Sequence, residues 1–302
     1  MTAILKREFK SSFQTIIGWI YVAVVIAAFS LYYFANNMSY GAPQISYSIS
    51  GILFVILIPV SVLTMRSLAE EQRSKTDQLI LTSPVSVVKI VVAKFLSMAA
   101  VHSITVGYIF IMTLVLNFFG DTPVAENLSA VFGFWLYGMA CISVGLFISS
   151  LTESQVISAV LTFAALFIGY MMSGITNLIS SDGNIITRIL GFYDLQTPVD
   201  EFMDGVLPID GVIYYVIFII LMLFLTTQSI QKRRWSFSSK KLSVGMYSTG
   251  LVAIAVVIAV VLNLVAESLP TEISSIDLTE QKLYTLTDDT KEFLSTLEDD
   301  VT

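Results

Sequence analysis

The side chains of this chain that could take part in polar chemistry gather in one stretch, residues 66–94, between two long uncharged intervals. No Asp, Glu, Lys, Arg or His occurs in residues 11–65, and only His102 interrupts the uncharged run 95–120. Acidic and basic side chains alternate along the first half of the stretch, at Arg66, Glu70, Glu71, Arg73, Lys75 and Asp77. Mixed signs favour contact with a folded protein, because anionic lipid headgroups attract purely basic clusters. We therefore expect a protein partner to dock here.

Catalytic chemistry is not indicated elsewhere in the sequence. The chain contains no phosphate-binding loop of the GxxxxGK[ST] type, no HExxH motif, no serine nucleophile elbow and no close carboxylate pair within its apolar runs. Its single cysteine, Cys141, excludes disulfide and cysteine–metal frameworks. We expect no catalytic residue, no metal site and no cofactor in this chain, and any energy from ATP must come from another protein.

The elements that position the charged stretch are membrane helices. The chain is 55% hydrophobic and only 13% charged, and its mean hydropathy is +0.80, which a soluble domain of this length cannot sustain. The apolar runs are continuous and rich in Leu, Ile, Ala and Phe, which favours helices over barrel strands. The pattern predicts an all-α polytopic membrane protein with seven spans, at residues 16–35, 45–65, 91–119, 128–151, 156–179, 212–230 and 242–266.

The basic residues predict the orientation. A cytoplasmic N-terminus places thirteen of the sixteen Lys and Arg residues inside and leaves only Arg188, Lys282 and Lys291 outside, with the C-terminus extracytoplasmic. Most acidic residues then lie outside, so the net charge of −7 belongs to the outer face and does not indicate nucleic acid. The first apolar run is too long for the core of a cleaved signal peptide, so we interpret it as a retained span.

Residues 1–15 are predicted to form an amphipathic helix on the inner membrane surface. Leu5, Phe9 and Phe13 recur every four residues, beside a polar set that contains Lys6 and Lys10. The alternative is a basic flank that only sets the topology. Further along, Pro59 is expected to kink the second span, because proline removes a backbone donor and crowds the preceding turn.

The charged stretch should contain a short helix joined rigidly to two spans. Residues 68–81 are compatible with a helix, Thr82 marks a break, and Ser83 and Pro84 suit the cap and first position of the helix that becomes the third span. This geometry could convert a push from a soluble partner into movement of membrane helices.

The stretch EEQRSKTDQLILTSPVSVVKIVVAK resembles the cytoplasmic loop of type-2 ABC exporter permeases, and the likeness covers roughly residues 1–231. In that family this loop holds the coupling helix that seats in the ATP-binding subunit. Carried over by position, the coupling residues are Glu70, Glu71, Arg73, Thr76, Leu79 and Pro84, and Lys75 stands where glycine is frequent. The resemblance implies a six-helix permease domain at 16–231 with its coupling loop at 66–94, in a bacterial cytoplasmic membrane. It also implies a cytoplasmic ATPase subunit that carries ATP and Mg²⁺, a homodimer or a heterodimer with another permease or auxiliary subunit, and surrounding membrane lipids.

Polar and small residues inside the spans have two interpretations each. His102 could relay protons, although a hydrogen bond to a Ser, Thr or carbonyl group is favoured because no span offers an acidic partner. Small residues on one face of the fourth span should pack within the subunit or against a second one; they are Gly138, Cys141, Gly145 and Ser149. Glu153, in the turn after that span, could touch an ATPase or serve a helix cap beside Thr152.

The connection 180–211 is expected to contain a short helix, with Thr197 as its N-cap, Pro198 at its first position and Gly205 past its end. The permease resemblance implies a re-entrant element that roofs the translocation path. The residues of this outer gate or roof would be Phe192, Tyr193, Pro198 and Gly205. A solvated acidic loop without a transport role is the alternative.

Residues 232–302 lie beyond the six spans that the permease resemblance implies. A cytoplasmic linker at 232–241 leads to the seventh span, and residues 267–302 resemble the beginning of the outer-face auxiliary subunit of gliding-motility-type ABC permeases. The matching residues are Asp277, Leu278, Thr279, Lys282, Tyr284, Leu286 and Thr290. We expect a truncated extracytoplasmic α/β domain with a helix capped by Thr287, or else a tail that packs on something else.

These features together predict a permease subunit of an ABC exporter that hydrolyses no ATP itself. The cargo is unidentified, and apolar spans without buried charge favour a lipid-like, peptide or otherwise amphipathic substrate. Two alternatives come from other classes, a gradient-driven secondary transporter and a membrane scaffold of an envelope complex.

Overall fold

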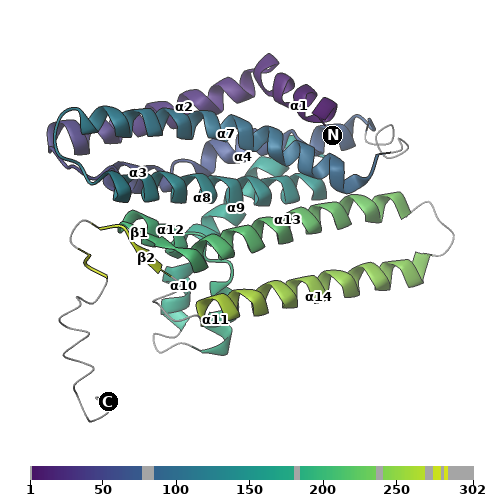
Figure 1. Ribbon diagram of the computed structural model, residues 1–302. Coiled ribbons are helices and arrows are strands. Elements are labelled where there is room, and N and C mark those ends of the chain that lie inside the picture. Colours follow the sequence, from purple (N-terminus) through teal and green to yellow (C-terminus); the bar gives the residue numbers. More distant parts are fainter. Residues whose placement is uncertain are drawn as a thin grey trace, which may run out of the picture.

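The computed structural model describes residues 2–76, 85–179, 184–235, 241–268, 275–279 and 282–284. Within them the chain is helical apart from one pair of short strands (Figure 1). Several residues considered above lie outside the described residues: Asp77, Leu79, Thr82, Ser83, Pro84, Leu286, Thr287 and Thr290.

The first part of the chain forms α1 (Thr2–Gln14), α2 (Ile16–Tyr33), the π-helical turn η1 (Phe34–Ser39), α3 (Ser46–Leu53), α4 (Leu57–Met65) and α5 (Ala69–Arg73). Next come α7 (Val87–Asn117), α8 (Val124–Leu151), α9 (Gln155–Tyr170), α10 (Met172–Ile179), α11 (Ile185–Gly191) and α12 (Thr197–Met203). Strand β1 (Val206–Pro208) leads into α13 (Ile209–Trp235), followed by α14 (Lys241–Glu267) and β2 (Ser275–Asp277).

The described residues contain four helices that are long and apolar enough to cross a membrane, or six spans when two bent helix pairs are each counted as one. These six coincide with the first six predicted spans. Helix α14 lies at the predicted seventh span, and its segment Gly250–Ala266 is a shorter apolar helix. The seventh membrane crossing therefore stays a prediction.

The second span is bent, as predicted from Pro59. Helices α3 and α4 meet at 55° across residues 54–56. A proline at position 59 cannot donate to the carbonyl of Val55, and its ring crowds that turn, so the break falls four residues before it.

The fifth span is also broken, which the sequence analysis did not predict. Helices α9 and α10 meet at 55° at Met171. The backbone N–H of Leu195 donates to the carbonyl of Gly169 at 3.1 Å, and the Tyr193 hydroxyl donates to the carbonyl of Ala165 at 3.2 Å. A segment from outside the helix thus binds carbonyls of its last turns, and α10 leaves in a new direction to pack on α11.

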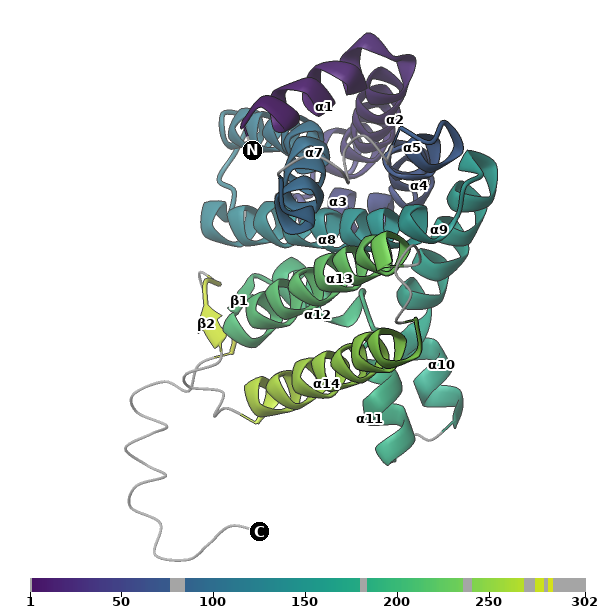
Figure 2. The same ribbon diagram turned by 90° about the vertical axis from the view of Figure 1, so that its right-hand side faces the viewer.

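Helix α8 is the centre of the bundle and lies between the layer of α2 and α7 and the layer of α13 (Figure 2). Its small residues face neighbouring helices of the same chain. A Cβ on Gly138 would lie 2.2 Å from Nε2 of His102, and one on Gly145 would lie 2.2 Å from Oγ1 of Thr64. This confirms the expectation that the small-residue face packs within the subunit.

His102 is hydrogen-bonded, as expected, although the hydroxyl that it meets on α2 belongs to a tyrosine and not to a Ser or Thr. Its Nδ1 lies 2.8 Å from the hydroxyl of Tyr21 on α2, and the imidazole is fully buried between α2, α7 and α8. This bond joins the first and third spans.

A short turn joins α8 to α9, and the two helices contact each other. The cap of α9 is Ser154, whose hydroxyl accepts from the N–H of Ile157 at 3.5 Å, and the Thr152 hydroxyl accepts from the N–H of Ser154 at 3.0 Å. Glu153 is exposed and takes no part in either bond.

The predicted helix in the outer connection is α12, with a different cap. Thr197 lies inside the helix, whose N-cap is Gln196. The carboxylate of Asp194 accepts from the N–H groups of Gln196 and Thr197 and from the Thr197 hydroxyl, at 3.0, 3.1 and 2.6 Å. The assignment of Thr197 as N-cap was therefore wrong, because a carboxylate further upstream takes the capping role. Gly205 follows the end of α12 with φ +82, as its predicted position requires.

Residues after α14 return to the connection that precedes α13. Strand β2 pairs antiparallel with β1, with Leu207 opposite Ile276. The described part of the tail therefore packs on the helical bundle, whereas the helix expected from Thr287 onward lies outside the described residues. The extracytoplasmic α/β domain stays a prediction.

Candidate functional site

Helix α5 is held on the end of α8 by backbone hydrogen bonds. The N–H groups of Leu68 and Ala69 both donate to the hydroxyl of Ser149 at 3.1 Å, and the Gln72 amide donates to the carbonyl of Ser150 at 2.9 Å. Because Ser149 satisfies two free N–H groups at the start of α5, the short helix has a fixed place although it spans little more than one turn.

The helix is shorter than the predicted 68–81, and its end has a defined geometry. The N–H of Thr76 donates to the carbonyl of Glu71 at 3.0 Å, and the N–H of Lys75 donates to the carbonyl of Gln72 at 3.2 Å. This is a Schellman motif, and Lys75 takes the left-handed position with φ 56. A glycine is favoured at such a position, which gives a physical reason for the glycine common there in the permeases that this stretch resembles.

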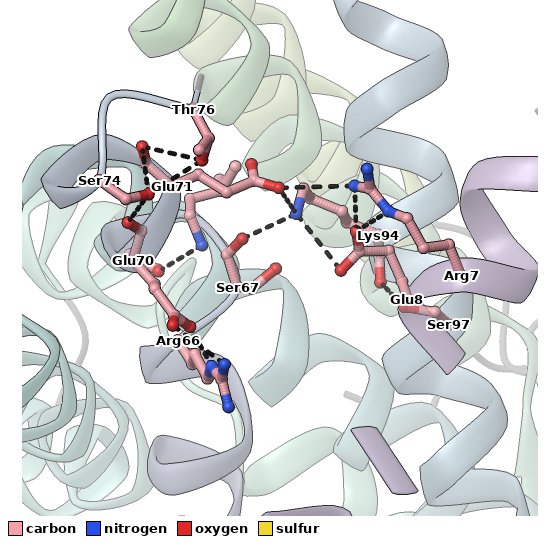
Figure 3. Close-up of polar contacts among 12 residues, drawn as sticks. Arg7, Glu8, Arg66, Ser67, Glu70, Glu71, Ser74, Thr76, Lys94 and Ser97 are labelled. Atoms are coloured by element: carbon pink, nitrogen blue, oxygen red, sulfur yellow. Dashed lines mark hydrogen bonds and ion pairs between the residues drawn. The ribbon is translucent and has the colours of Figure 1, made fainter. Parts of the chain in front are cut away.

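A buried lysine connects three segments beside α5 (Figure 3). The side chain of Lys94, on α7, is 1% exposed, and its Nζ lies 2.8 Å from the carbonyl oxygen of Ser67 and 2.9 Å from Oε1 of Glu71. The carboxylate of Glu8, on α1, lies 3.4 Å away. We call Arg7, Glu8, Glu71 and Lys94 the ionic cluster.

Arg7 completes the ionic cluster from α1. Its guanidinium lies 2.6 Å from the carboxylate of Glu8 and 3.6 Å from that of Glu71, and the hydrogen bond to Glu8 raises the pKa of Arg7. Burial raises the pKa of Glu71 by more than the charge of Lys94 lowers it. Two cations and two anions thus alternate, and α1 is fastened to both α5 and α7.

The predicted coupling residues divide into two groups. Glu71 points inward to Lys94, whereas Arg73 and Thr76 are exposed at the end of α5. Glu70 is half-buried and forms a bidentate ion pair with Arg66 one turn away. The structure therefore brings Glu71 into the ionic cluster and leaves Glu70, Arg73 and Thr76 on the surface.

Sequence reasoning missed Glu8, Ser67 and Lys94 as members of this site. One signal was available for Lys94, which stands within the apolar residues of a membrane helix and therefore needs a buried partner. Glu8 offered no such signal, since it lies among charged residues on an amphipathic helix.

A cavity of about 600 Å³ lies next to the ionic cluster, between α1, the α4–α5 corner and α7. Its lining combines the cluster's charges with hydroxyl groups, which include Ser11, Ser12, Thr15, Ser74 and Thr76.

The predicted roof residues lie at the opposite end of the bundle (Figure 1). Phe192 packs on Tyr214 and Phe218 of α13, with ring centroids 6.2 and 6.1 Å apart. Tyr193 is bound to α9 as described above. Pro198 borders a cavity of about 330 Å³ between α11, α12, α13 and α14, and Gly205 lies against Glu126 of α8.

Among the residues that the structure describes, no group of three or more His, Cys, Asp or Glu side chains is arranged to hold a metal ion.

The model of one protein family, described as ABC-2 family transporter protein, matches residues 36–228 of the chain. The matched region runs from η1 into α13 and includes α5, the central helix α8 and the outer connection. No curated protein and no solved structure matches the chain.

Proposed function

Because this chain belongs to the ABC-2 family of transporter proteins, we propose that it is the permease subunit through which a separate ATPase drives export of a substrate. One observation carries this proposal. The short helix α5 presents an exposed charged end, while its other side is bonded to α8 and, through Lys94, to α7 and α1. Such an element would transmit a force from a surface partner to the spans α7 and α8 and to the amphipathic helix α1.

The partner would dock on the exposed end of α5, at Arg73, Lys75 and Thr76, next to the Glu70–Arg66 pair. It would lie on the cytoplasmic side and supply ATP and Mg²⁺, since the sequence contains no phosphate-binding loop. A push on α5 would reach α8 through Ser149, because two backbone N–H groups of the short helix converge on that hydroxyl. The same push would reach α7 and α1 through the ionic cluster.

Opening of the path would then involve the roof residues at the far end of α8 and α13. The described spans contain few charged side chains inside the bundle, which favours an amphipathic, lipid-like or peptide cargo over a small ion. The permease would act as a dimer with itself or with a related subunit, so that two ATPases could close on each other.

The test is co-purification of the full chain in detergent from its native membranes, with ATPase activity assayed. Reversal of one exposed charge, Arg73→Glu, should remove the bound ATPase and its activity while the chain stays folded. Lys232→Glu changes an equally exposed charge at the end of α13 and should leave the ATPase bound. Glu71 is unsuitable for this test, because its reversal would disrupt the ionic cluster inside the protein.

Two results would contradict the proposal. The first is a full complement of ATPase on the Arg73→Glu chain. The second is substrate uptake into proteoliposomes that contain this chain alone and are driven by an ion gradient, which would indicate a secondary transporter.

A further inference from the structure

The strand pair β1–β2 joins parts of the chain that are far apart in sequence. The register pairs Val206 with Asp277, Leu207 with Ile276 and Pro208 with Ser275. The pairing extends one residue further, since the N–H of Leu278 donates to the carbonyl of Gly205 at 3.2 Å. The chain after α14 thus adds a strand to the connection between α12 and α13.

Three of the described residues that follow β2 are held together by hydrogen bonds to the Asp277 carboxylate and the Thr279 hydroxyl. Asp277 accepts from the N–H and the hydroxyl of Thr279 at 2.9 and 2.5 Å, and from the N–H of Tyr284 at 2.8 Å. The Thr279 hydroxyl in turn accepts from the N–H of Leu283 at 2.9 Å. In the docked arrangement these local bonds satisfy the backbone N–H groups of Thr279, Leu283 and Tyr284.

Gly205 and Glu126 leave room for the side chain of Thr279. Thr279 is buried, and its methyl group lies beside Gly205, where a Cβ would come within 3.2 Å of it and within 2.8 Å of the Glu126 side chain. Gly205 also has φ +82, which side-chain-bearing residues rarely adopt. Glu126 lies in the first turn of α8 and accepts from the Gln44 amide at 3.2 Å, so Thr279 lies near the start of the central helix and the start of the second span.

The opposite side of β1 is already occupied. The Ser129 hydroxyl, on α8, donates to the carbonyl of Val206 at 2.7 Å. Of the two edges of β1, one faces α8 and the other accepts a strand.

We propose that β1 and Gly205 form a strand-docking site whose occupants are the described residues 275–279 and 282–284 of the same chain. The site recognises an extended stretch followed by residues that bond to the Asp277 carboxylate, and it fastens whatever follows α14 to the ends of α8 and α12. This assignment concerns the geometry of the chain and holds whether or not the transport function is as proposed.

A cysteine pair tests the register directly. In the full-length protein with Cys141→Ala, the double variant Leu207→Cys and Ile276→Cys should form a disulfide in native membranes on mild oxidation, because directly opposed strand residues have suitable spacing. The free thiols are counted after denaturation with a maleimide that adds visible mass. We expect most of the protein to lose both labels, and to regain them on reduction.

The matched control moves one cysteine by one residue. In Leu207→Cys with Ser275→Cys the two side chains point to opposite faces of the pair, so both thiols should stay labelled. Adding Gly205→Ala to the first pair should slow disulfide formation several-fold, because the new Cβ crowds Thr279 and Glu126.

Three results would overturn the proposal. Equal oxidation of the two cysteine pairs would show that the segment has no fixed register. An unoxidised first pair in protein that still purifies as a folded species would show that the strand is not docked. A disulfide between two copies would show that a second copy, and not the chain's own segment, occupies the site.

Discussion

The environment of Lys94 differs from that of an ordinary lysine in a membrane helix. Lysine side chains near the ends of spans usually extend to the water interface, yet this one is almost completely buried and bound to three acceptors. Its charge is tolerated because Glu71, Glu8 and a backbone carbonyl replace water. Removal of Lys94 takes from the Glu71 carboxylate its nearest counter-charge and leaves only Arg7, whose guanidinium is 3.6 Å away and whose side chain is 58% exposed. Loss of one partner from a buried ion pair costs more than the complete pair contributes.

We therefore expect Lys94→Met to destabilise the folded protein by about 3–5 kcal/mol, since Glu71 would lose its nearest counter-charge and keep only the more distant Arg7. Thermal unfolding in detergent measures the loss. The exposed Lys89→Met, one and a half turns earlier on the same helix, should change the stability by less than about 0.5 kcal/mol. Similar melting of the two variants would show that the cluster does not hold α1 and α5.

The glycine at position 138 permits the contact between α7 and α8 at His102. An added methyl group would lie 2.2 Å from the imidazole Nε2, and Tyr21 holds that ring from the other side. Gly138→Ala should therefore destabilise the protein by about 1–3 kcal/mol.

The matched control is Gly107→Ala on α7, where no heavy atom lies within 4 Å of the new methyl group. This variant should be neutral or slightly stabilising, because alanine is the better helix former. If both alanine variants melted alike, close packing at His102 would not be the reason for Gly138.

At the scale of elements, the two broken spans have different causes. The bend between α3 and α4 follows from a covalent property of Pro59, whereas the bend between α9 and α10 follows from hydrogen bonds that Tyr193 and Leu195 make to carbonyls of α9. The second break gives the outer connection a fixed place, because its backbone is bonded to a membrane helix. Helix α12 then packs on α8, where Phe202 lies against Gly133.

Asp200, on α12, should make the stability of this outer connection depend on pH. Burial, followed by the charges of Asp204 and Asp194, raises its pKa from 3.8 to about 6, although a hydrogen bond from Gln196 opposes the shift. The folded state therefore holds a proton that the unfolded state has lost between pH about 4 and 6. Stability should fall as the pH rises through this window and then level off.

Thermal unfolding of the wild-type protein and of Asp200→Asn across this range checks the expectation. The asparagine variant should lose much of the dependence and should be the more stable protein at pH 7. A wild-type stability that rises with pH over the whole window, unchanged by Asp200→Asn, would contradict it.

At the scale of the whole molecule, the strand pair constrains the path of the chain. Helix α13 starts beside β1 and runs to the end that carries α5, and α14 packs along α13. Because β2 must return to β1, the chain after α13 has to run back along the full length of the bundle (Figure 1). The seventh membrane crossing and the extracytoplasmic C-terminus stay predictions.

Single cysteines in a Cys141→Ala background test this topology in sealed inverted vesicles and intact cells. An impermeant maleimide should label Ser74→Cys only from the cytoplasmic side, and Gly120→Cys and Leu283→Cys only from the outer side. All three positions are exposed. Labelling of Leu283→Cys from the same side as Ser74→Cys would show that α14 does not cross the membrane.

The sequence by itself determined the properties that depend on composition and on local covalent geometry. These include the membrane class, the six apolar intervals, the bend at Pro59, the existence of a short charged helix after the second span and the glycine that follows α12. Each follows from residues close together in the chain, whose hydrophobicity, missing backbone donor or permitted dihedral angles act without a distant partner.

Only the tertiary structure decided which distant groups satisfy one another. It placed Lys94 against Glu71 and Glu8, replaced Thr197 by Asp194 as the cap of α12, broke the fifth span through Leu195 and paired β2 with β1. Buried charges and buried backbone groups need partners. For each such group the sequence offers several residues that could fill this role. The choice among those partners depends on how the helices pack, which no local pattern in the chain records.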